Sequence, residues 1–220
     1  MANTYLTRTP SSAGNKKIFT FSAWLKGHNT EVDGSGYFFT ADVSGGSNID
    51  AIGITASGLQ VSVNSANSGV LNSSRLFRDM SSWYHIVWSV DTTQATASNR
   101  MKIYVNGVQE TAWDTETYPS QNYDFAINGT TEHNVSYRSG YFSGLMTHVH
   151  FIDGTAYDAS AFGETDATTG EWEAKTSPSV TYGTNGFLIL KDGNTITDQS
   201  SNSNDFTLGG GTLTDLKDNP

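Results

Sequence analysis

The chain has 220 residues, no cysteine, and 22 acidic against 12 basic residues, which gives a formal net charge of −10. An acidic surface repels phosphate backbones, so the composition argues against nucleic-acid binding. No stretch approaches the roughly 18 apolar residues of a membrane span, and the N-terminal sequence MANTYLTRTP lacks the basic and apolar regions of a secretion signal. We therefore expect no membrane insertion and no leader.

Segments that alternate with period two between turn residues predict strands along the whole chain. In chain order they cover residues 19–26, 36–40, 51–55, 58–64, 83–91, 101–105, 125–128, 140–153, 186–191 and 205–208. The pair Asn106-Gly107 predicts a hairpin with a type I′ turn, because both residues tolerate positive φ. Residues 156–178 lack the alternation and contain a predicted helical turn with Asp158 as its N-cap.

The pattern predicts an all-β fold, a two-sheet antiparallel jelly-roll sandwich, in one domain over residues 1–208. Residues 209–220 then form a C-terminal tail or the start of a linker. The aromatic residues at strand positions are expected to fill the core between the sheets. They are Phe21, Trp24, Trp83, Trp88, Tyr104 and Phe151.

The order of several motifs resembles the laminin-G-like and concanavalin A-like domains. The resemblance lies in an aromatic strand, a W-Y-H-I-V strand, a Y-V-N-G hairpin and a late strand that begins with glycine. In this sequence they are residues 19–26, 82–87, 102–107 and 144–153. It implies the concanavalin A-like sandwich and covers most of the chain.

A narrower resemblance in the C-terminal half is to laminin-G-like modules of bacteriophage structural proteins, especially those of marine phages. Residues 151–156, 162–166, Trp172, 182–187 and 198–206 carry it. It implies a virion component at the virion surface, assembled in the host cytoplasm, as a module of a tail fibre or appendage, a capsid decoration or a head fibre. The implied partners are other virion proteins, in a homo-oligomer or multicopy assembly, and a host surface glycan.

Two pairs of residues were considered for catalysis or transition-metal binding. Glu171 and Glu173 have the spacing of paired glycosidase carboxylates, but they lie in a polar segment without an apolar strand pattern. His148 and His150 are expected on one strand face, where a metal would need a third donor. The non-functional interpretation is a solvated acidic loop for the glutamates and a solvent-facing or hydrogen-bonded pair for the histidines. We expect no enzyme activity.

Calcium is the cofactor that the acidic loops favour, because it prefers carboxylate and carbonyl oxygens. The candidate ligands are Asp42, Asp50, Asp153, Asp192 and Asp198. The alternative is turn chemistry, since aspartate side chains stabilise turns.

Aromatic residues in or beside predicted loops are candidates for an interface or a sugar platform. They are Trp113, Tyr118, Tyr123, Tyr137 and Tyr141. Two functions stay open: a non-enzymatic virion protein that acts through protein or host-surface contacts, and a calcium-dependent, lectin-like carbohydrate-binding module.

Overall fold

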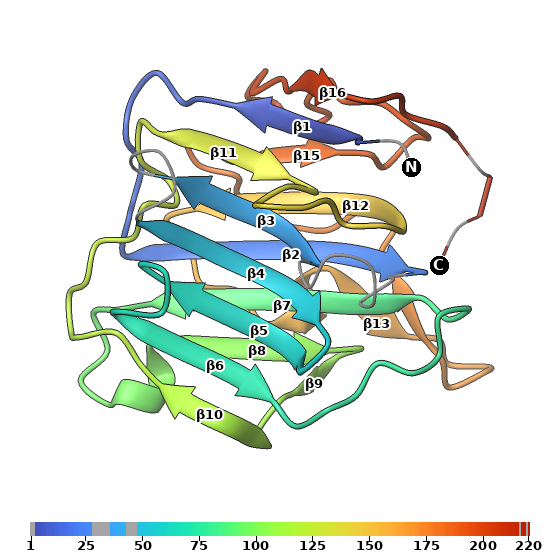
Figure 1. Cartoon of the computed structure of the whole chain (residues 1–220). Coiled ribbons are helices and arrows are strands. Elements are labelled where there is room, and N and C mark those ends of the chain that lie inside the picture. The colour runs from blue at the N-terminus through green and yellow to red at the C-terminus, as the bar shows by residue number, and fades with distance from the viewer. Residues whose placement is uncertain (1–2, 28–35, 43–47, 216, 219) are drawn as a thin grey trace.

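The computed structural model describes residues 3–27, 36–42, 48–215, 217–218 and 220. Its described strands form two facing antiparallel sheets and a separate two-stranded hairpin (Figure 1). This is the predicted all-β sandwich. Among the described residues no helix is long and apolar enough to span a membrane.

The front layer in Figure 1 is an eight-stranded sheet. In spatial order its strands are β10 (Trp113–Thr117), β6 (Gly69–Ser73), β5 (Gly58–Val63), β4 (Ile49–Thr55), β3 (Tyr37–Asp42), β11 (Glu132–Val135), β1 (Tyr5–Arg8) and β16 (Thr207–Gly210). The six-stranded sheet behind it contains β15 (Phe187–Ile189), β12 (Leu145–Asp153), β2 (Ile18–Lys26), β7 (Tyr84–Asp91), β8 (Met101–Val105) and β9 (Val108–Gln109).

Aromatic rings from both sheets form the core, because alternate residues of each strand face the opposite sheet. Phe21 and Phe39 stack across it with centroids 4.5 Å apart, and Phe19 meets Trp88 edge to face at 5.4 Å. The core placement of Phe21, Trp88 and Phe151 is confirmed.

Three other aromatic residues were wrongly placed between the sheets. Trp24 is buried, but it packs on His85 on the outer face of the six-stranded sheet. Tyr104 lies on the same outer face, and Trp83 is half-exposed just before β7. The alternation gives the spacing of residues along a strand, but it does not say which of the two faces meets the other sheet when both are apolar.

The predicted Asn106-Gly107 hairpin is confirmed. Val105 pairs with Val108, and φ is 47° at Asn106 and 82° at Gly107, as a type I′ turn requires. The Asp158 cap is also confirmed, since its carboxylate accepts a hydrogen bond of 2.9 Å from the backbone of Ser160 at the start of η2 (Ala159–Ala161).

The predicted strand over residues 125–128 is wrong. These residues are buried, but the backbone N–H groups of Ala126 and Ile127 donate to the carboxylate of Asp50, and φ of Asn128 is 67°. Their apolar character reflects burial in a turn, where the backbone hydrogen bonds go to a side chain instead of a neighbouring strand.

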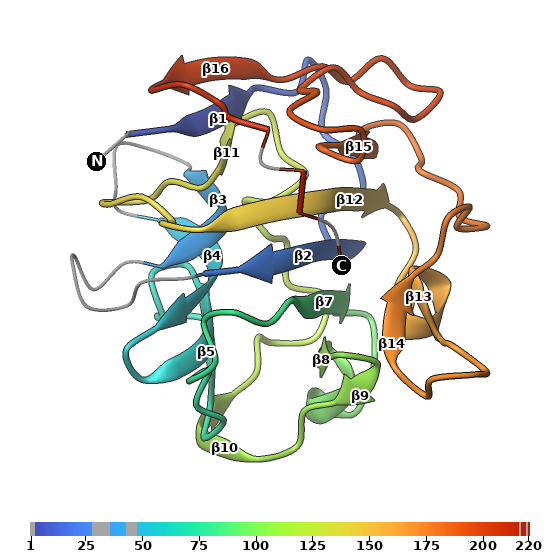
Figure 2. The same cartoon turned by 90° about the vertical axis from the view of Figure 1, so that its right-hand side faces the viewer.

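A cover layer lies over the outer face of the six-stranded sheet. It contains the hairpin of β13 (Gly163–Thr165) and β14 (Trp172–Ala174), and Figure 2 shows this hairpin on the far side of the six-stranded sheet from the eight-stranded one. Val87 and Ile152 of the sheet pack there against Phe162 and Trp172. Both faces of the six-stranded sheet are therefore buried over much of their area.

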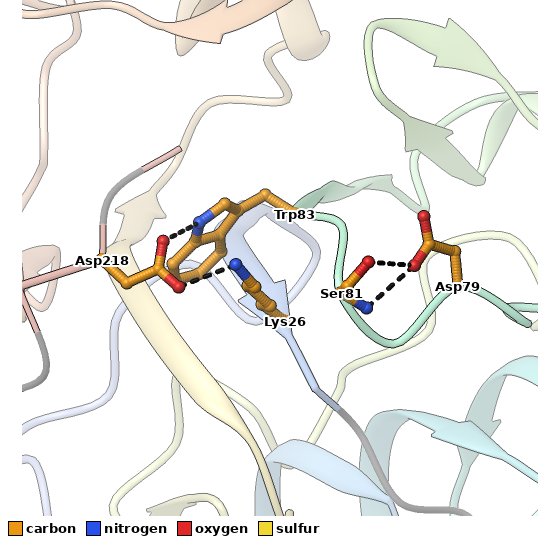
Figure 3. A network of polar contacts seen from close by, with 5 residues as sticks. All are labelled: Lys26, Asp79, Ser81, Trp83 and Asp218. Atoms are coloured by element: carbon orange, nitrogen blue, oxygen red, sulfur yellow. Dashed lines mark hydrogen bonds and ion pairs between the residues drawn. The ribbon is translucent and has the colours of Figure 1, made fainter.

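The chain beyond Leu208 continues to contact the domain. β16 extends to Gly210, which pairs with Tyr5, so the strand passes the boundary expected at residue 208. Further along, the carboxylate of Asp218 accepts hydrogen bonds from Lys26 at 2.7 Å and from the indole of Trp83 at 3.2 Å (Figure 3).

Candidate functional site

The five aspartates proposed as calcium ligands do not form one site. Asp50 accepts backbone N–H bonds from Asn64 at 2.8 Å and Ile127 at 3.3 Å, as well as from Ala126. Burial raises the pKa of Asp50, against the lowering effect of those three hydrogen bonds. This carboxylate therefore joins two loops to the sheet.

Asp153 and Asp198 have similar structural roles. Asp153 accepts from the backbone of Asn15 at 2.8 Å and of Asn185 at 3.1 Å. Asp198 accepts from the backbone N–H groups of Leu188, Ser200 and Asn204 at 2.8 to 2.9 Å. These bonds are the turn chemistry that is the alternative to metal binding.

The other two aspartates lie apart from these. Asp192 is exposed and accepts from Gln199 at 2.5 Å, while Asp42 ends β3, and most of the Ser/Gly turn that follows it falls outside the described residues. In the described chain no three His, Cys, Asp or Glu side chains come together as a metal would require. The described residues do not fit a shared calcium site, so we derive no role for calcium, and calcium binding is tested by the melting-temperature measurement in the Discussion.

The candidate aromatic residues divide into two groups. Trp113, Tyr118 and Tyr123 are partly buried against the main core. Tyr137 and Tyr141 instead lie together, with ring centroids 5.2 Å apart. The Tyr5 ring lies beside both, with its centroid 4.8 Å from that of Tyr137 and 6.0 Å from that of Tyr141. The structure therefore brings together only two of the five predicted rings, and adds a third that the sequence did not single out.

The histidine pair lies at an irregular point in β12. The register shifts between Thr147 and His150, and φ of His148 is 50°, so the two rings do not share a regular strand face. His150 is buried and its Nδ1 lies 2.9 Å from the hydroxyl of Tyr182, while Nδ1 of His148 lies 3.0 Å from the hydroxyl of Thr147. Burial holds the pKa of His150 well below its usual range, and the charges of nearby His148, His85 and Lys191 lower it further.

Glu171 and Glu173 are both exposed on either side of Trp172 in and beside β14, and Glu173 pairs across the hairpin with Glu164. Trp172 points the other way, into the cover layer. The two carboxylates therefore face solvent outside any enclosed cleft, and nothing in their surroundings resembles the shielded carboxyl that a general acid needs.

A polar pocket opens at one end of the outer face of the six-stranded sheet, with a volume of about 350 Å³. This volume lies at the lower end of the range for small-molecule sites. The lining residues are Ser89, Asp91, Gln94, Asn99, Lys102, Tyr104, Ala156 and Asp158. None of the residues that the sequence offered as candidate ligands or interface residues lines this pocket.

The floor of the pocket follows from strand alternation. Trp88 and Val90 of β7 face the core, so Ser89 and Asp91 face outward, and β8 places Lys102 directly across from Ser89. The signal was present in the sequence as polar residues alternating with core residues in two neighbouring strands. This alternation alone does not predict a pocket, because the loops that border this face come from distant parts of the sequence.

Two walls of the pocket are fixed by buried or half-buried polar groups. The hydroxyl of Thr20 donates to the carbonyl of Thr155 and accepts from the backbone of Tyr157, each at 2.8 Å, which holds the loop before Asp158. The guanidinium of Arg100 donates to the carbonyls of Gln94 and Ala95 at 2.9 and 2.8 Å. The loops around the pocket are therefore pre-organised.

Four side chains at the pocket have polar groups that could bind a ligand. Across the part of the chain that the structure describes, the side chains of Ser89, Asn99, Lys102 and Tyr104 make no hydrogen bond or ion pair. Convergent polar groups without protein partners can fix the orientation of a polar ligand. The Tyr104 ring adds an apolar surface.

Two carboxylates, those of Asp91 and Asp158, line the pocket as hydrogen-bond acceptors. Burial acts to raise the pKa of Asp91, but hydrogen bonds from Thr93 and Gln94 outweigh it and the pKa is lowered. Asp158 is occupied in part by the cap of η2. With Asp91 and Asp158 against Lys102, the pocket has an excess of negative charge, which disfavours an anionic ligand.

The comparisons agree with the sandwich architecture. Residues 2–161 match a laminin-G family described as the concanavalin A-like lectin/glucanases superfamily, and the chain belongs to this family. Among curated proteins the sequence matches none.

Similar solved structures include a heptameric SAP-like pentraxin from Limulus polyphemus. It is 13% identical, with 87% of this chain and 90% of that chain covered and a TM-score of 0.54. Botulinum neurotoxin type C is 12% identical over 71% of this chain and 40% of that chain, with a TM-score of 0.43. The enzymatically active domain of tailspike protein 2 from bacteriophage CBA120 is 12% identical over 71% of this chain and 25% of that chain, with a TM-score of 0.40. At these identities the likeness concerns the fold alone.

Proposed function

We propose that this chain is a non-enzymatic, lectin-like recognition module that binds a neutral saccharide in the polar pocket between β7, β8 and the loop before η2. The observation that carries the proposal is the convergence of Ser89, Asn99, Lys102 and Tyr104, whose polar groups have no partner in the described structure. A saccharide presents hydroxyl groups that both donate and accept, and such a ligand matches an ammonium, an amide and carboxylates at once.

The state of the acids supports binding over catalysis. Glycoside hydrolysis needs one carboxyl whose pKa is raised so that it can protonate the leaving group. The pKa of Asp91 is instead lowered. Asp91 is therefore suited to accept hydrogen bonds from a ligand and not to donate a proton to it.

We further propose that the module is displayed in many copies on a phage virion, as part of a tail fibre or appendage, a capsid decoration or a head fibre. The resemblance of the C-terminal series to phage laminin-G-like modules supports this, with other virion proteins and a host surface glycan as partners. Several of those residues, including Phe162, Trp172 and Tyr182, form the cover layer. Weak single contacts would then add through multivalency.

The pocket is tested by screening the protein on a glycan array and titrating the best neutral saccharide by calorimetry. Asn99→Ala and Lys102→Met should each weaken binding about tenfold, the cost of about one hydrogen bond. Glu173→Gln, an exposed change on the hairpin, is the control and should bind as the wild type does. Undiminished binding by both pocket variants would contradict the proposal, as would an array without neutral hits.

The place of display is tested separately. Mass spectrometry of purified particles from a host that expresses the gene should find the chain in the virion, and gold-labelled antibody should place it on the particle surface. A chain found only in the soluble lysate would contradict virion display and would leave the saccharide proposal to its own test.

A further inference from the structure

The outer face of the eight-stranded sheet has a second surface with a different chemistry. Tyr5, Tyr137 and Tyr141 form a cluster of half-buried rings, and their hydroxyls make no hydrogen bond within the described chain. Tyrosine supplies a large, rigid contact area at low entropy cost and a hydroxyl that can donate. The cluster is therefore suited to contact with a ligand.

The rings of this surface lie over glycines. Leu6 faces the core, so Tyr5 beside it in β1 faces outward, and its ring lies so close to Gly209 that a Cβ there would come within 2.3 Å. The Tyr37 ring lies across Gly53 of β4 in the same way, where a Cβ would come within 2.8 Å of it. These contacts hold both rings close to the sheet. Tyr37 is itself buried, so the accessible rings of this surface are those of Tyr5, Tyr137 and Tyr141.

Arg138 belongs to the same surface. Its guanidinium carbon lies 4.5 Å from the centroid of the Tyr37 ring, a cation–π contact. The turn that carries it is held by the bridge between Tyr137 and Tyr141, and by a hydrogen bond of 3.1 Å from the backbone of Arg138 to Gly140. Arg138 forms no ion pair with any carboxylate of the described residues, although the protein has a net charge of −10.

We propose that this Tyr–Arg face (Tyr5, Tyr137, Arg138 and Tyr141, with the buried Tyr37 ring supporting Arg138) is a docking surface for a carboxylate-bearing saccharide. The face and this ligand are complementary in charge and in hydrogen-bonding groups. The face offers a guanidinium and phenol donors, so it fits a ligand rich in anionic acceptors, and guanidinium binds carboxylate through two parallel hydrogen bonds. Sugar rings can lie against the half-buried rings of Tyr5, Tyr137 and Tyr141.

The Tyr–Arg face and the polar pocket should therefore select opposite ligands. The pocket has Asp91 and Asp158 against one lysine, whereas the cation of the Tyr–Arg face has no carboxylate partner among the described residues. The two surfaces lie on the outer faces of different sheets. This inference goes beyond the proposed function and does not depend on the pocket, because each surface has its own variants and its own probe.

The test uses oligogalacturonate and the same oligosaccharide with its carboxylates methyl-esterified, titrated into the full chain at low salt. The acid form should bind at least about tenfold more tightly than the ester, and binding should weaken with added salt. Arg138→Gln should lose about tenfold or more, and Arg138→Lys should recover only part, since lysine lacks the two-pronged geometry.

Three controls keep the outcomes distinct. Arg78→Gln, which removes an exposed arginine from the loop between β6 and β7, and the pocket variant Asn99→Ala should both bind the acid form as the wild type does. Tyr141→Phe removes only a hydroxyl and should weaken binding by a few fold without changing the melting temperature. Equal binding of acid and ester, no binding of the acid form, or full binding by Arg138→Gln would overturn the proposal.

Discussion

The indole Nε1 of Trp172 donates a hydrogen bond of 3.0 Å to Nδ1 of His85, which is fully buried on the outer face of the six-stranded sheet. Because indole can only donate, Nδ1 must accept, and the imidazole proton lies on Nε2, which donates to the hydroxyl of Ser22 at 2.8 Å. Trp24 stacks on the same imidazole with centroids 4.8 Å apart. A neutral histidine thus joins the cover layer to the sheet.

Replacing Trp172 by phenylalanine should destabilise the fold by about 1–3 kcal/mol, because the buried Nδ1 of His85 would lose its donor. Urea denaturation measures the change. Glu171→Gln alters the exposed neighbour and should stay within about 0.5 kcal/mol of the wild type. If the two variants unfold at the same urea concentration, the hydrogen bond does not hold the cover layer.

Stability should fall as the pH drops from 7 to 5. Burial lowers the pKa of His85 to about 3 and, against a hydrogen bond to Thr131, that of His133 to about 4. Below about pH 6.5 the unfolded chain takes up protons on these residues that the folded chain takes up only near pH 3 to 4. Each histidine therefore costs about 1.4 kcal/mol per pH unit within that window.

Asp50 acts in the opposite direction, since burial raises its folded pKa and acidification between its unfolded and folded pKa favours the folded state. The measurement is the free energy of unfolding in urea at pH 7.5, 6.0 and 5.0. A value independent of pH over this range would show that the histidines are solvated in the native protein.

Asp50→Asn should be among the most damaging single changes. The carboxylate accepts backbone hydrogen bonds from two loops, and an amide would offer one oxygen and present N–H groups to the others. We expect a loss of about 2–4 kcal/mol, or a melting temperature lower by roughly 5–15 °C. Asp124→Asn, at an exposed position, is the matched control and should melt with the wild type.

Calcium should not stabilise the protein, because Asp50, Asp153 and Asp198 already accept backbone hydrogen bonds in separate places. The melting temperature in millimolar calcium chloride and in excess chelator should agree within about 1 °C. A ligand at 100 times its dissociation constant stabilises the folded state by about 2.7 kcal/mol, so a real site would be visible as a clear rise.

Strand positions could be predicted from the sequence wherever local chemistry fixed them. The alternation in residues 19–26 and the Asn106-Gly107 turn both depend on neighbours in the chain, and both are confirmed. The strand predicted over residues 125–128 is absent because the carboxylate of Asp50, far away in the sequence, accepts the backbone hydrogen bonds that a neighbouring strand would have accepted. Apolar composition alone does not distinguish a buried turn from a buried strand.

The two proposed surfaces were harder to predict, because each joins distant segments. The pocket needs β7, β8 and the loop before η2, and the cluster around Tyr137 needs Tyr5 from the first strand. The sequence marked Tyr137 and Tyr141 as ring-bearing loop residues, but nothing local linked them to Tyr5. It favoured aspartates as calcium ligands, and gave no sign that backbone N–H groups already occupy three of them.

The central claim, that the polar pocket binds a neutral saccharide, is tested most directly by residue-resolved nuclear magnetic resonance. The labelled protein is titrated with the tightest-binding neutral saccharide of the array, and backbone amide shifts are followed. The largest changes should fall on residues 89–91, 99–104 and 156–158. Changes confined to other parts of the molecule, or none at saturating saccharide, would contradict the account.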